Sequence, residues 1–379
     1  MTLSARTELS HAYSFDSKID AIFKITLVAE KRTEAKGFHH IIVLDTSKSM
    51  DGQKIELAKN GAQEYVKSIP SGNLVSVVLF SSTVQAYPET RLSEVLPKIR
   101  ASGLTALYAA LQSAFEIAQK SRLPGWIVLL TDGEPTDVTK PEQYSKLKMP
   151  TGFQMIEFGI GADYNQSILK ALADASGGML HNITDAQKLK LPSMMQESAV
   201  NEVGARNISV DFGTPDVKIL NYKGPPVTIN AVETIAKIWG RVQIPAGFNG
   251  RLLNIQITYS DTIDDKKKTI NAPIEVKLAK NDEQFSEGIN NNLVSEFTYY
   301  QGLEEYYQHL AAGQLKEATK TMNQLSANAE QTRRTDLIEA TKRLSDQHEA
   351  TLRLGGSTES TNRLLKEAAS ETTKRTRGK

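Results

Sequence analysis

Five oxygen-bearing side chains could together hold a metal ion. Two are carboxylates, three are hydroxyls, and none offers sulfur or nitrogen: Asp45, Ser47, Ser49, Thr105 and Asp132. Hard oxygen ligands of this kind suit Mg²⁺ or Mn²⁺ far better than zinc. Octahedral positions would stay open for a water molecule or for a partner's carboxylate. The sequence therefore predicts a Mg²⁺ (or Mn²⁺) site with room for a further ligand.

A doubly wound parallel sheet would position these side chains. The apolar runs 41–44, 74–80 and 126–130 have strand length, and residues 57–66 and 107–118 carry apolar side chains three and four positions apart. Strands that alternate with helices indicate an α/β fold. Since the first acidic motif directly follows residues 41–44, we expect the site at the carboxyl ends of the strands, where open α/β sheets bind ligands.

The motifs resemble the metal-ion-dependent adhesion site of von Willebrand factor A (vWA) domains. The matching residues are Asp-Thr-Ser-Lys-Ser at 45–49, Thr105 in Ser-Gly-Leu-Thr-Ala-Leu-Tyr, and Asp132 in Thr-Asp-Gly-Glu. The likeness includes Phe-Gly-Ile-Gly-Ala-Asp-Tyr-Asn at 158–165 and covers residues 36–197. It implies a metal site in which Asp132 acts through a bridging water. An open alternative is a metal that only stabilises the fold, with no partner reaching it.

Composition favours a multidomain protein with no strong global field. A chain of 379 residues has room for two or three domains, and its 45 basic and 44 acidic residues give a net charge of +1. Such a balance does not drive binding to nucleic acid or to a membrane surface. Cysteine is absent, so disulfides and thiol chemistry are excluded. With neither a signal-like apolar core at the start nor a run of about 18 apolar residues, we expect a cytoplasmic protein without a membrane span.

Short strands on both sides of the vWA segment indicate a second domain. Residues 21–29 read as a strand before the vWA segment begins, and strand-like runs separated by Gly and Pro return between residues 203 and 280, one of them over residues 252–259. This later spacing is typical of an antiparallel β-sandwich. We therefore expect residues 1–33 to supply strands to a sandwich formed by residues 203–280, with the vWA domain inserted between them.

The carboxy-terminal part is expected to be helical. Residues 282–354 repeat apolar side chains three or four apart, with Gly313 placed to end the first long helix, and this favours a helical bundle. Residues 355–379 form a basic tail rich in Ser and Thr, part of which we expect to be mobile. A Ser/Thr kinase and a phosphatase could act on its hydroxyls, and phosphates there would suit an Arg-lined phosphopeptide reader. The candidates are Ser357, Thr358, Ser360, Thr361, Ser370, Thr372, Thr373 and Thr376.

Catalysis has little support in the sequence. Asp132, Glu134 and Asp137 are close in sequence, and paired carboxylates can transfer protons, but no nucleophile elbow, zincin motif or phosphate-binding loop accompanies them. The six histidines show no metal-ligand spacing. We interpret Glu134 and Asp137 as charges on the rim of the metal site and expect no enzymatic activity; a metal-dependent hydrolase is the remote alternative.

The layout of the whole chain resembles crenarchaeal vWA regulators of the archaellum network, and its architecture resembles the Sec23/Sec24 coat subunits. The first resemblance implies a phosphorylation-dependent scaffold that partners with a forkhead-associated (FHA) domain protein and represses motility. The alternative is a metal-dependent adaptor that binds an acidic partner residue, like a cofactor of an AAA+ ATPase or an adhesion protein. Lys48, between the two site serines, could reach the open metal position and either weaken cation binding or favour an acidic ligand.

Overall fold

Two compact units make up the chain. One joins Met1–Glu30 to Asn207–Lys379, and the other comprises Lys31–Arg206. The computed structural model describes residues 3–30, 37–161, 163–197, 204–232, 234–261 and 266–377. The junctions expected between residues 33 and 36 and between 197 and 203 fall on 31–36 and 198–203, outside these described ranges.

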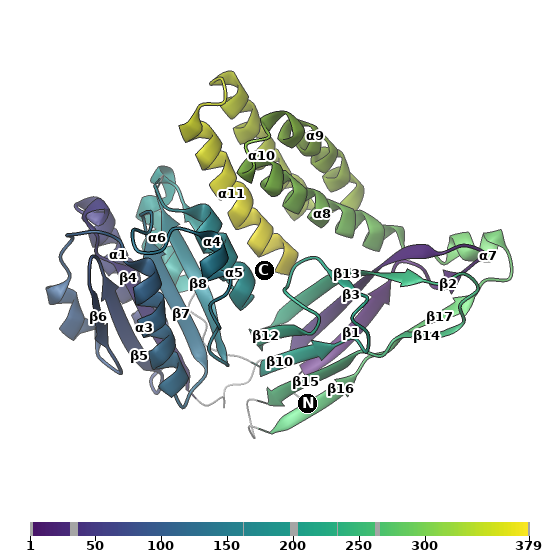
Figure 1. Ribbon diagram of the computed structural model, residues 1–379, viewed down its shortest axis with the longest axis horizontal. Coiled ribbons are helices and arrows are strands. Elements are labelled where there is room, and N and C mark those ends of the chain that lie inside the picture. The colour runs from purple at the N-terminus through teal and green to yellow at the C-terminus, as the bar shows by residue number, and fades with distance from the viewer. Residues whose placement is uncertain are drawn as a thin grey trace. The chain divides into compact units, whose positions relative to one another are not determined.

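A six-stranded sheet forms the centre of the 31–206 unit, in the order β6-β5-β4-β7-β8-β9 (Figure 1). All neighbours pair in parallel except β6, which runs antiparallel to β5 at the edge. Every residue of β4 is buried, as expected for a central strand covered on both faces. The strands are β4 (His39–Asp45), β5 (Leu74–Phe80), β6 (Val84–Tyr87), β7 (Gly125–Thr131), β8 (Phe153–Ile160) and β9 (Met179–Ile183).

Helices connect these strands and cover the sheet. Helices α1 and α6 lie side by side, α3 packs on β4 and β5, and α5 packs on β8 and β9. The buried residues of α3 recur three and four apart, from Leu107 to Ala118, as its sequence predicts. The doubly wound fold is therefore confirmed. The helices are α1 (Gln53–Ser68), α2 (Leu92–Val95), α3 (Leu107–Lys120), α4 (Pro141–Tyr144), α5 (Gln166–Ser176) and α6 (Leu191–Glu197), with 3₁₀ turns η1 (Lys48–Met50), η2 (Leu96–Lys98) and η3 (Asp185–Lys190).

The other unit contains a sheet built from both ends of the chain. Strands β1 (Leu3–Leu9), β3 (Ile19–Ala29), β13 (Ile235–Ile244) and β11 (Lys218–Ile219) follow one another in the order β1-β3-β13-β11. Strand β3 pairs antiparallel with β1 on one side and along ten residues with β13 on the other. The amino-terminal strands and strands that follow the vWA segment thus share one hydrogen-bonded sheet.

Two further sheets complete the strands of this unit. One has the order β12-β10-β15-β16, formed by β12 (Val227–Val232), β10 (Ala205–Asp211), β15 (Gln256–Asp261) and β16 (Lys267–Asn271). The other has the order β14-β17-β2, formed by β14 (Gly250–Leu253), β17 (Ile274–Leu278) and β2 (Tyr13–Ser14). The sequence predicted one strand over residues 252–259. This prediction is wrong, because the chain leaves one sheet after Leu253 and enters another at Gln256. The prediction also omitted β16, where two lysines and a threonine mask the strand pattern.

Four long helices form a bundle at the carboxy-terminal end, which confirms the bundle predicted over residues 282–354 and adds a fourth long helix to it. The short α7 (Asp282–Glu287) precedes α8 (Asn291–Ala311), α9 (Leu315–Thr332), α10 (Thr335–Arg353) and α11 (Thr358–Arg377). Helix α8 packs on α9 and α11, and α10 packs on α9 and α11, so the four enclose one core. The bundle is green to yellow in Figure 1. Gly313 follows α8 with φ of 69°, a conformation that ends helices and that glycine adopts without strain.

The expectation of a mobile tail is wrong for residues 358–377, which form α11. Leu364, Leu365, Ala368 and Ala369 recur at helical spacing and are buried, so this helix has an apolar stripe despite its polar composition. Its last turn is also anchored, because Asn221 Nδ2 donates to the backbone oxygen of Thr376 at 2.6 Å. The many Ser and Thr residues of this segment conceal the apolar stripe in the sequence.

The β3–β13 part of the first sheet is buried on both faces. Phe23 lies opposite Gly240 in the register, and a Cβ at residue 240 would collide with the Phe23 ring 2.4 Å away. The Phe23 ring instead packs over this glycine and against Phe212, 5.5 Å between centroids. On the other face, Trp239 contacts Tyr300 of α8, 5.3 Å between centroids. These strands therefore join a sandwich core to the helical bundle.

This packing predicts that Phe23→Ala destabilises the unit strongly. We expect the free energy of unfolding to fall by about 3–5 kcal/mol, because a fully buried ring would leave a cavity. The chain has two tryptophans, Trp126 in one unit and Trp239 in the other. In a Trp126→Phe background, the fluorescence of Trp239 during denaturant unfolding reports on this unit alone.

Val28→Ala is the matched control on the same strand. Val28 is 38% exposed, and a truncation there should cost about 0.5–1 kcal/mol. Equal losses from both substitutions would contradict a core centred on Phe23.

Candidate metal centre

Asp45 lies buried at the carboxyl end of β4, fixed by two hydrogen bonds. The amide of Ser47 donates to Oδ1 at 2.8 Å, and the hydroxyl of Thr131, at the end of β7, donates to Oδ2 at 2.5 Å. Burial raises the pKa of Asp45 to about 6; these hydrogen bonds oppose the rise, and the nearby charge of Asp132 adds to it. The carboxylate therefore carries a negative charge that is costly without a cation.

A chain of hydroxyls connects Asp45's loop to Asp132. The hydroxyl oxygens of Ser47 and Ser49 are 3.0 Å apart, and Ser49 Oγ donates to Asp132 Oδ1 at 2.7 Å. Asp132 is fully buried and follows β7, the neighbour of β4. Four of the five predicted ligands thus form one hydrogen-bonded cluster at adjacent strand ends.

Thr105 joins this cluster through its loop. Backbone hydrogen bonds from Ser102 to the carbonyl of Thr46 (2.8 Å) and from Lys48 to the carbonyl of Gly103 (3.1 Å) hold that loop against the Asp45 loop. A Cβ at residue 133 would lie 3.2 Å from Thr105 Oγ1 and 3.4 Å from Ser49 Oγ. The glycine therefore leaves space between two of the predicted ligands.

The assembled side chains fit a hard divalent cation. Two buried carboxylates and three hydroxyls offer only oxygen, which is the donor set that Mg²⁺ and Mn²⁺ prefer. Within the described ranges, no cluster of three His, Cys, Asp or Glu side chains offers another metal site. Such a cation would offset the charge of Asp45 and Asp132 and could bind a partner's carboxylate.

The ammonium at this site belongs to Lys54, not to Lys48. Lys48 is 71% exposed and pairs with Asp51, 2.6 Å between Nζ and Oδ2. Lys54, in the first turn of α1, donates from Nζ to Oδ2 of Asp132 and is only 19% exposed. Sequence reasoning missed Lys54, because nothing in its spacing from Asp45 shows that α1 turns it back toward β7.

The rim carboxylates have structural partners. Glu134 Oε2 accepts from the Asn165 amide at 2.7 Å, and Asp137 Oδ2 accepts from the backbone amide of Ala109 at 3.0 Å. Asp137 thereby caps the first turn of α3. Both side chains lie on exposed residues. This arrangement matches a rim that stabilises loops around the metal centre.

The histidines of β4 are core residues. The ring nitrogens of His39 lie 2.7 Å from Ser76 Oγ and 2.9 Å from Ser121 Oγ, and His40 Nδ1 lies 2.9 Å from the hydroxyl of Tyr65. Burial lowers the pKa of His40 to about 3, so this side chain stays neutral near pH 7. Both lie at the amino end of β4, at the opposite end of the strand from Asp45.

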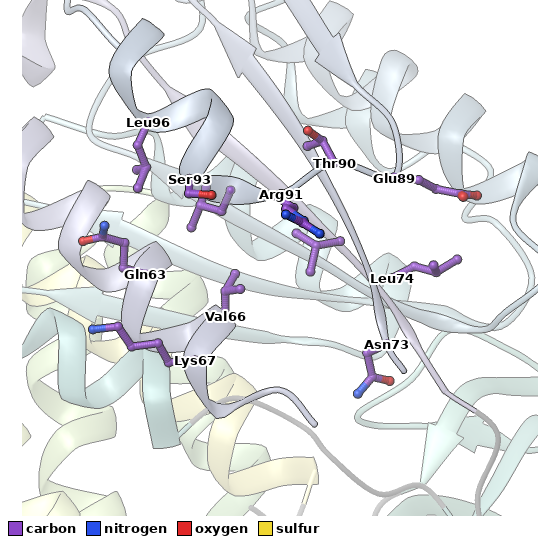
Figure 2. A pocket seen from close by; sticks show the side chains of 12 residues that line it. Gln63, Val66, Lys67, Asn73, Leu74, Glu89, Thr90, Arg91, Ser93 and Leu96 are labelled. Atoms are coloured by element: carbon purple, nitrogen blue, oxygen red, sulfur yellow. The ribbon is translucent and has the colours of Figure 1, made fainter. Parts of the chain in front are cut away.

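A separate hollow of about 530 Å³ opens on the same unit (Figure 2). Residues of α1, the start of β5 and the segment 89–96 line it, among them Val66, Lys67 and Arg91. Leu74 lines this hollow, whereas Phe80, at the other end of β5, is in register with Asp45. Phe80 lies six residues after Leu74 along the strand, a distance of about 20 Å. This hollow is therefore distinct from the metal centre.

The predicted phosphorylation sites fall into two groups on α11 and the turn before it. Ser357 and Thr358 are exposed, and Ser360 and Thr361 are half-buried. The other four are buried: Ser370, Thr372, Thr373 and Thr376. The hydroxyls of Thr372 and Thr376 each donate to a backbone oxygen one turn earlier, at 2.7 and 2.8 Å. Only the first group is open to a kinase while α11 stays packed.

The electrostatics of Asp45 predict a pH-dependent stability. Its folded-state pKa of about 6 lies above the ordinary value of 3.8, so the folded metal-free protein holds a proton that the unfolded chain has lost. Stability without metal should therefore fall as the pH rises from about 4 to about 6, by at most about 3 kcal/mol. Asp45→Asn removes this cost, and we expect a higher melting temperature at pH 7.5 in chelator but no stabilisation by Mg²⁺.

Asp51→Asn is the control for this prediction, since Asp51 is an exposed carboxylate near the same loop. It should leave the Mg²⁺ response intact. Thermal melts at pH 5 and pH 7.5, with chelator or Mg²⁺, measure both variants. Wild-type-like stabilisation of Asp45→Asn by Mg²⁺ would show that the metal does not use Asp45.

Two segments of the chain match known protein families. Residues 41–197 match the von Willebrand factor type A domain, and residues 291–378 match "Archaellum regulatory network B, C-terminal domain". The second match covers helices α8 to α11. Among curated proteins, a von Willebrand factor A domain-containing protein of Dictyostelium discoideum is 25% identical over 285 residues, covering 70% of this chain and 28% of that protein. Inter-alpha-trypsin inhibitor heavy chain H1 of Sus scrofa is 27% identical over 165 residues, covering 38% of this chain and 18% of that protein.

Solved structures extend the likeness to the whole chain. The ArnB paralog VWA2 from Sulfolobus acidocaldarius is 26% identical, covers 98% of both chains and superposes with a TM-score of 0.80. A von Willebrand factor type A protein from Catenulispora acidiphila shares the fold at 16% identity, with a TM-score of 0.69 and coverage of 90% and 89%. The human COPII-coat protein Sec24c shares it at 9% identity, with a TM-score of 0.56 and coverage of 92% and 60%.

This chain spans less than a third of the length of the two curated relatives above. Among the described helices, none combines the length and the apolar character that crossing a membrane requires. The resemblance to archaellum-network vWA regulators is confirmed by both family matches and by a solved relative that covers nearly the whole chain. The chain thus combines a segment that matches the vWA domain with a segment that matches the C-terminal domain of archaellum regulatory network B.

Proposed function

We propose that this chain is a non-enzymatic, cytoplasmic scaffold that regulates archaeal motility through phosphorylation-dependent binding of a partner. The observation that carries this proposal is the match of residues 291–378 to the archaellum regulatory network B domain, in a chain that resembles an ArnB paralog over 98% of its length. The partner would be an FHA-type phosphopeptide reader, and a Ser/Thr kinase and a phosphatase would set the switch.

The turn before α11 supports a modification site. Ser357 and Ser360 line a hollow of about 230 Å³ together with Arg363, between the end of α10 and the start of α11. Their hydroxyl oxygens lie 2.9 Å apart. A phosphate here would lie near the amino end of a 20-residue helix, where the helix dipole favours negative charge. Phosphorylation of this group would therefore leave α11 folded and present the phosphate on the surface.

The buried group requires a different event. Thr372, Thr373 and Thr376 lie in the half of α11 whose end is anchored by Asn221, and Arg375 adds an ion pair to Asp336, 3.3 Å between Nη1 and Oδ2. A phosphate on these hydroxyls would be buried without a solvation shell, which is costly. Modification of this group would therefore require α11 to detach, and we assign the switch to the accessible group.

This assignment predicts opposite outcomes for two variants that each carry four alanine substitutions. Replacing Ser357, Thr358, Ser360 and Thr361 should abolish kinase-dependent capture by an FHA module, because the accessible acceptors are gone. Replacing Ser370, Thr372, Thr373 and Thr376 should leave capture within about twofold of wild type, because these hydroxyls are buried in the packed helix. Pull-down after co-expression with a Ser/Thr kinase, with phosphosite mapping by mass spectrometry, measures both.

Phosphatase treatment of the wild type is the control and should abolish capture. Capture that survives the first variant and fails with the second would move the switch to the buried half of α11. Capture that survives phosphatase would refute the phosphorylation-dependent scaffold.

A second candidate is a metal-dependent adaptor that binds an acidic residue of a partner, as an AAA+ ATPase cofactor subunit or an adhesion-type protein does. The observation that favours it is the convergence of five oxygen-bearing side chains beside Leu104, a large apolar side chain that is 61% exposed. An exposed apolar residue next to a metal with open coordination positions suits a protein surface. Mg²⁺ or Mn²⁺ would supply a Lewis acid there to bind the partner's carboxylate.

Asp45→Asn separates the two candidates. A scaffold that works through its phosphorylated segment should keep FHA capture, since Asp45 and α11 lie in different units. An adaptor that works through the metal should lose its partner to the same extent as in chelator. Cross-linking pull-downs from the native lysate, with Asp51→Asn as control, compare the two outcomes.

A further inference from the structure

Lys54 holds the position of a cation at the metal centre. Its ammonium donates to Oδ2 of Asp132, whose other oxygen, Oδ1, accepts from Ser49. Asp132 is fully buried and Lys54 is 19% exposed, so this ion pair is largely shielded from water. A shielded pair is much stronger than an exposed one, because solvent and salt screen it less.

We infer that Lys54 is a built-in competitor for the divalent cation and that it sets the metal affinity of this site. The inference rests on the metal site proposed above. Without metal, Asp45 and Asp132 place two carboxylates in one buried cluster, and the Lys54 ammonium offsets one of these charges. A divalent cation that uses Asp132 must take over the carboxylate that Lys54 already binds.

The structure also provides an alternative partner for the displaced ammonium. Lys54 Nζ lies 3.8 Å from Oδ2 of Asp163, whose side chain is 74% exposed. When a metal binds at Asp132, Lys54 can pair with Asp163 at the surface without leaving its helix. The ammonium then lies at the edge of the site, where it favours an acidic ligand from a partner.

Lys48 is the matched control that separates competition from a general charge effect. It lies six residues before Lys54, in η1, and carries the same charge, but it is 71% exposed and pairs with Asp51. Removing either lysine makes the unit more negative by one charge. Only removal of Lys54 frees a carboxylate of the metal cluster.

The test compares Mg²⁺ and Mn²⁺ binding to the wild type, Lys54→Met and Lys48→Met in the full chain by isothermal titration calorimetry. We expect Lys54→Met to bind about tenfold more tightly or better, and Lys48→Met to change by about threefold or less, because its charge is screened. Thermal melts in chelator and in saturating Mg²⁺ provide a second readout. The melting temperature of Lys54→Met should be lower than that of Lys48→Met in chelator and higher in saturating Mg²⁺.

Lys54→Gln replaces Lys54→Met if the latter does not fold, because a neutral amide keeps a hydrogen-bond donor near Asp132. Equal affinities of the two single variants, in a wild type that binds Mg²⁺, would overturn the role of Lys54 and leave the metal site intact. Absence of binding in all three proteins would overturn both the competition and the metal site. Tighter binding in Lys54→Met alone supports the inference.

Discussion

Two buried carboxylates at adjacent strand ends impose the constraint on which the candidate metal centre depends. Asp45 ends β4, Asp132 follows β7, and both are fully buried. Charge in such a place is costly unless hydrogen bonds or a cation offset it. The neighbouring segments supply these offsets through the Ser47 amide, the Thr131 hydroxyl at the end of β7 and the Lys54 ammonium in α1. These three groups are placed so that they stabilise negative charge at one edge of the sheet.

The other unit depends on a sheet that is buried on both faces. Strand β3 lies between β1 and β13, and its neighbour β13 carries Gly240 beneath the Phe23 ring and Trp239 against helix α8. One pair of strands thus serves a sandwich core on one face and a helical bundle on the other. The bundle in turn holds α11, whose end is bound by Asn221 through the backbone oxygen of Thr376. This packing decides which hydroxyls of α11 are accessible.

The two candidate functions use different units of the chain. The candidate metal centre lies in the 31–206 unit, whereas the accessible hydroxyls before α11 lie in the unit that joins both ends of the chain. A regulator with two such surfaces can bind one partner through a phosphorylated segment and another through a metal. The match to the archaellum regulatory network B domain covers the helical bundle and favours the first of these surfaces as the regulated one.

The sequence by itself determined the doubly wound sheet, the helical bundle and the set of metal-ligand candidates, because these depend on local periodicity and on motifs that follow single strands. Apolar spacing in α3 and α8 matches the buried faces of these helices. Tertiary structure decided what depends on contacts between distant segments: the pairing of β3 with β13, the break between β14 and β15, and the burial of Thr372 and Thr376 in a helix expected to be a mobile tail. It also decided which lysine reaches the candidate metal centre. Lys48 is closer in sequence to the site serines, but helix α1 turns Lys54 toward Asp132, and only the fold fixes that direction.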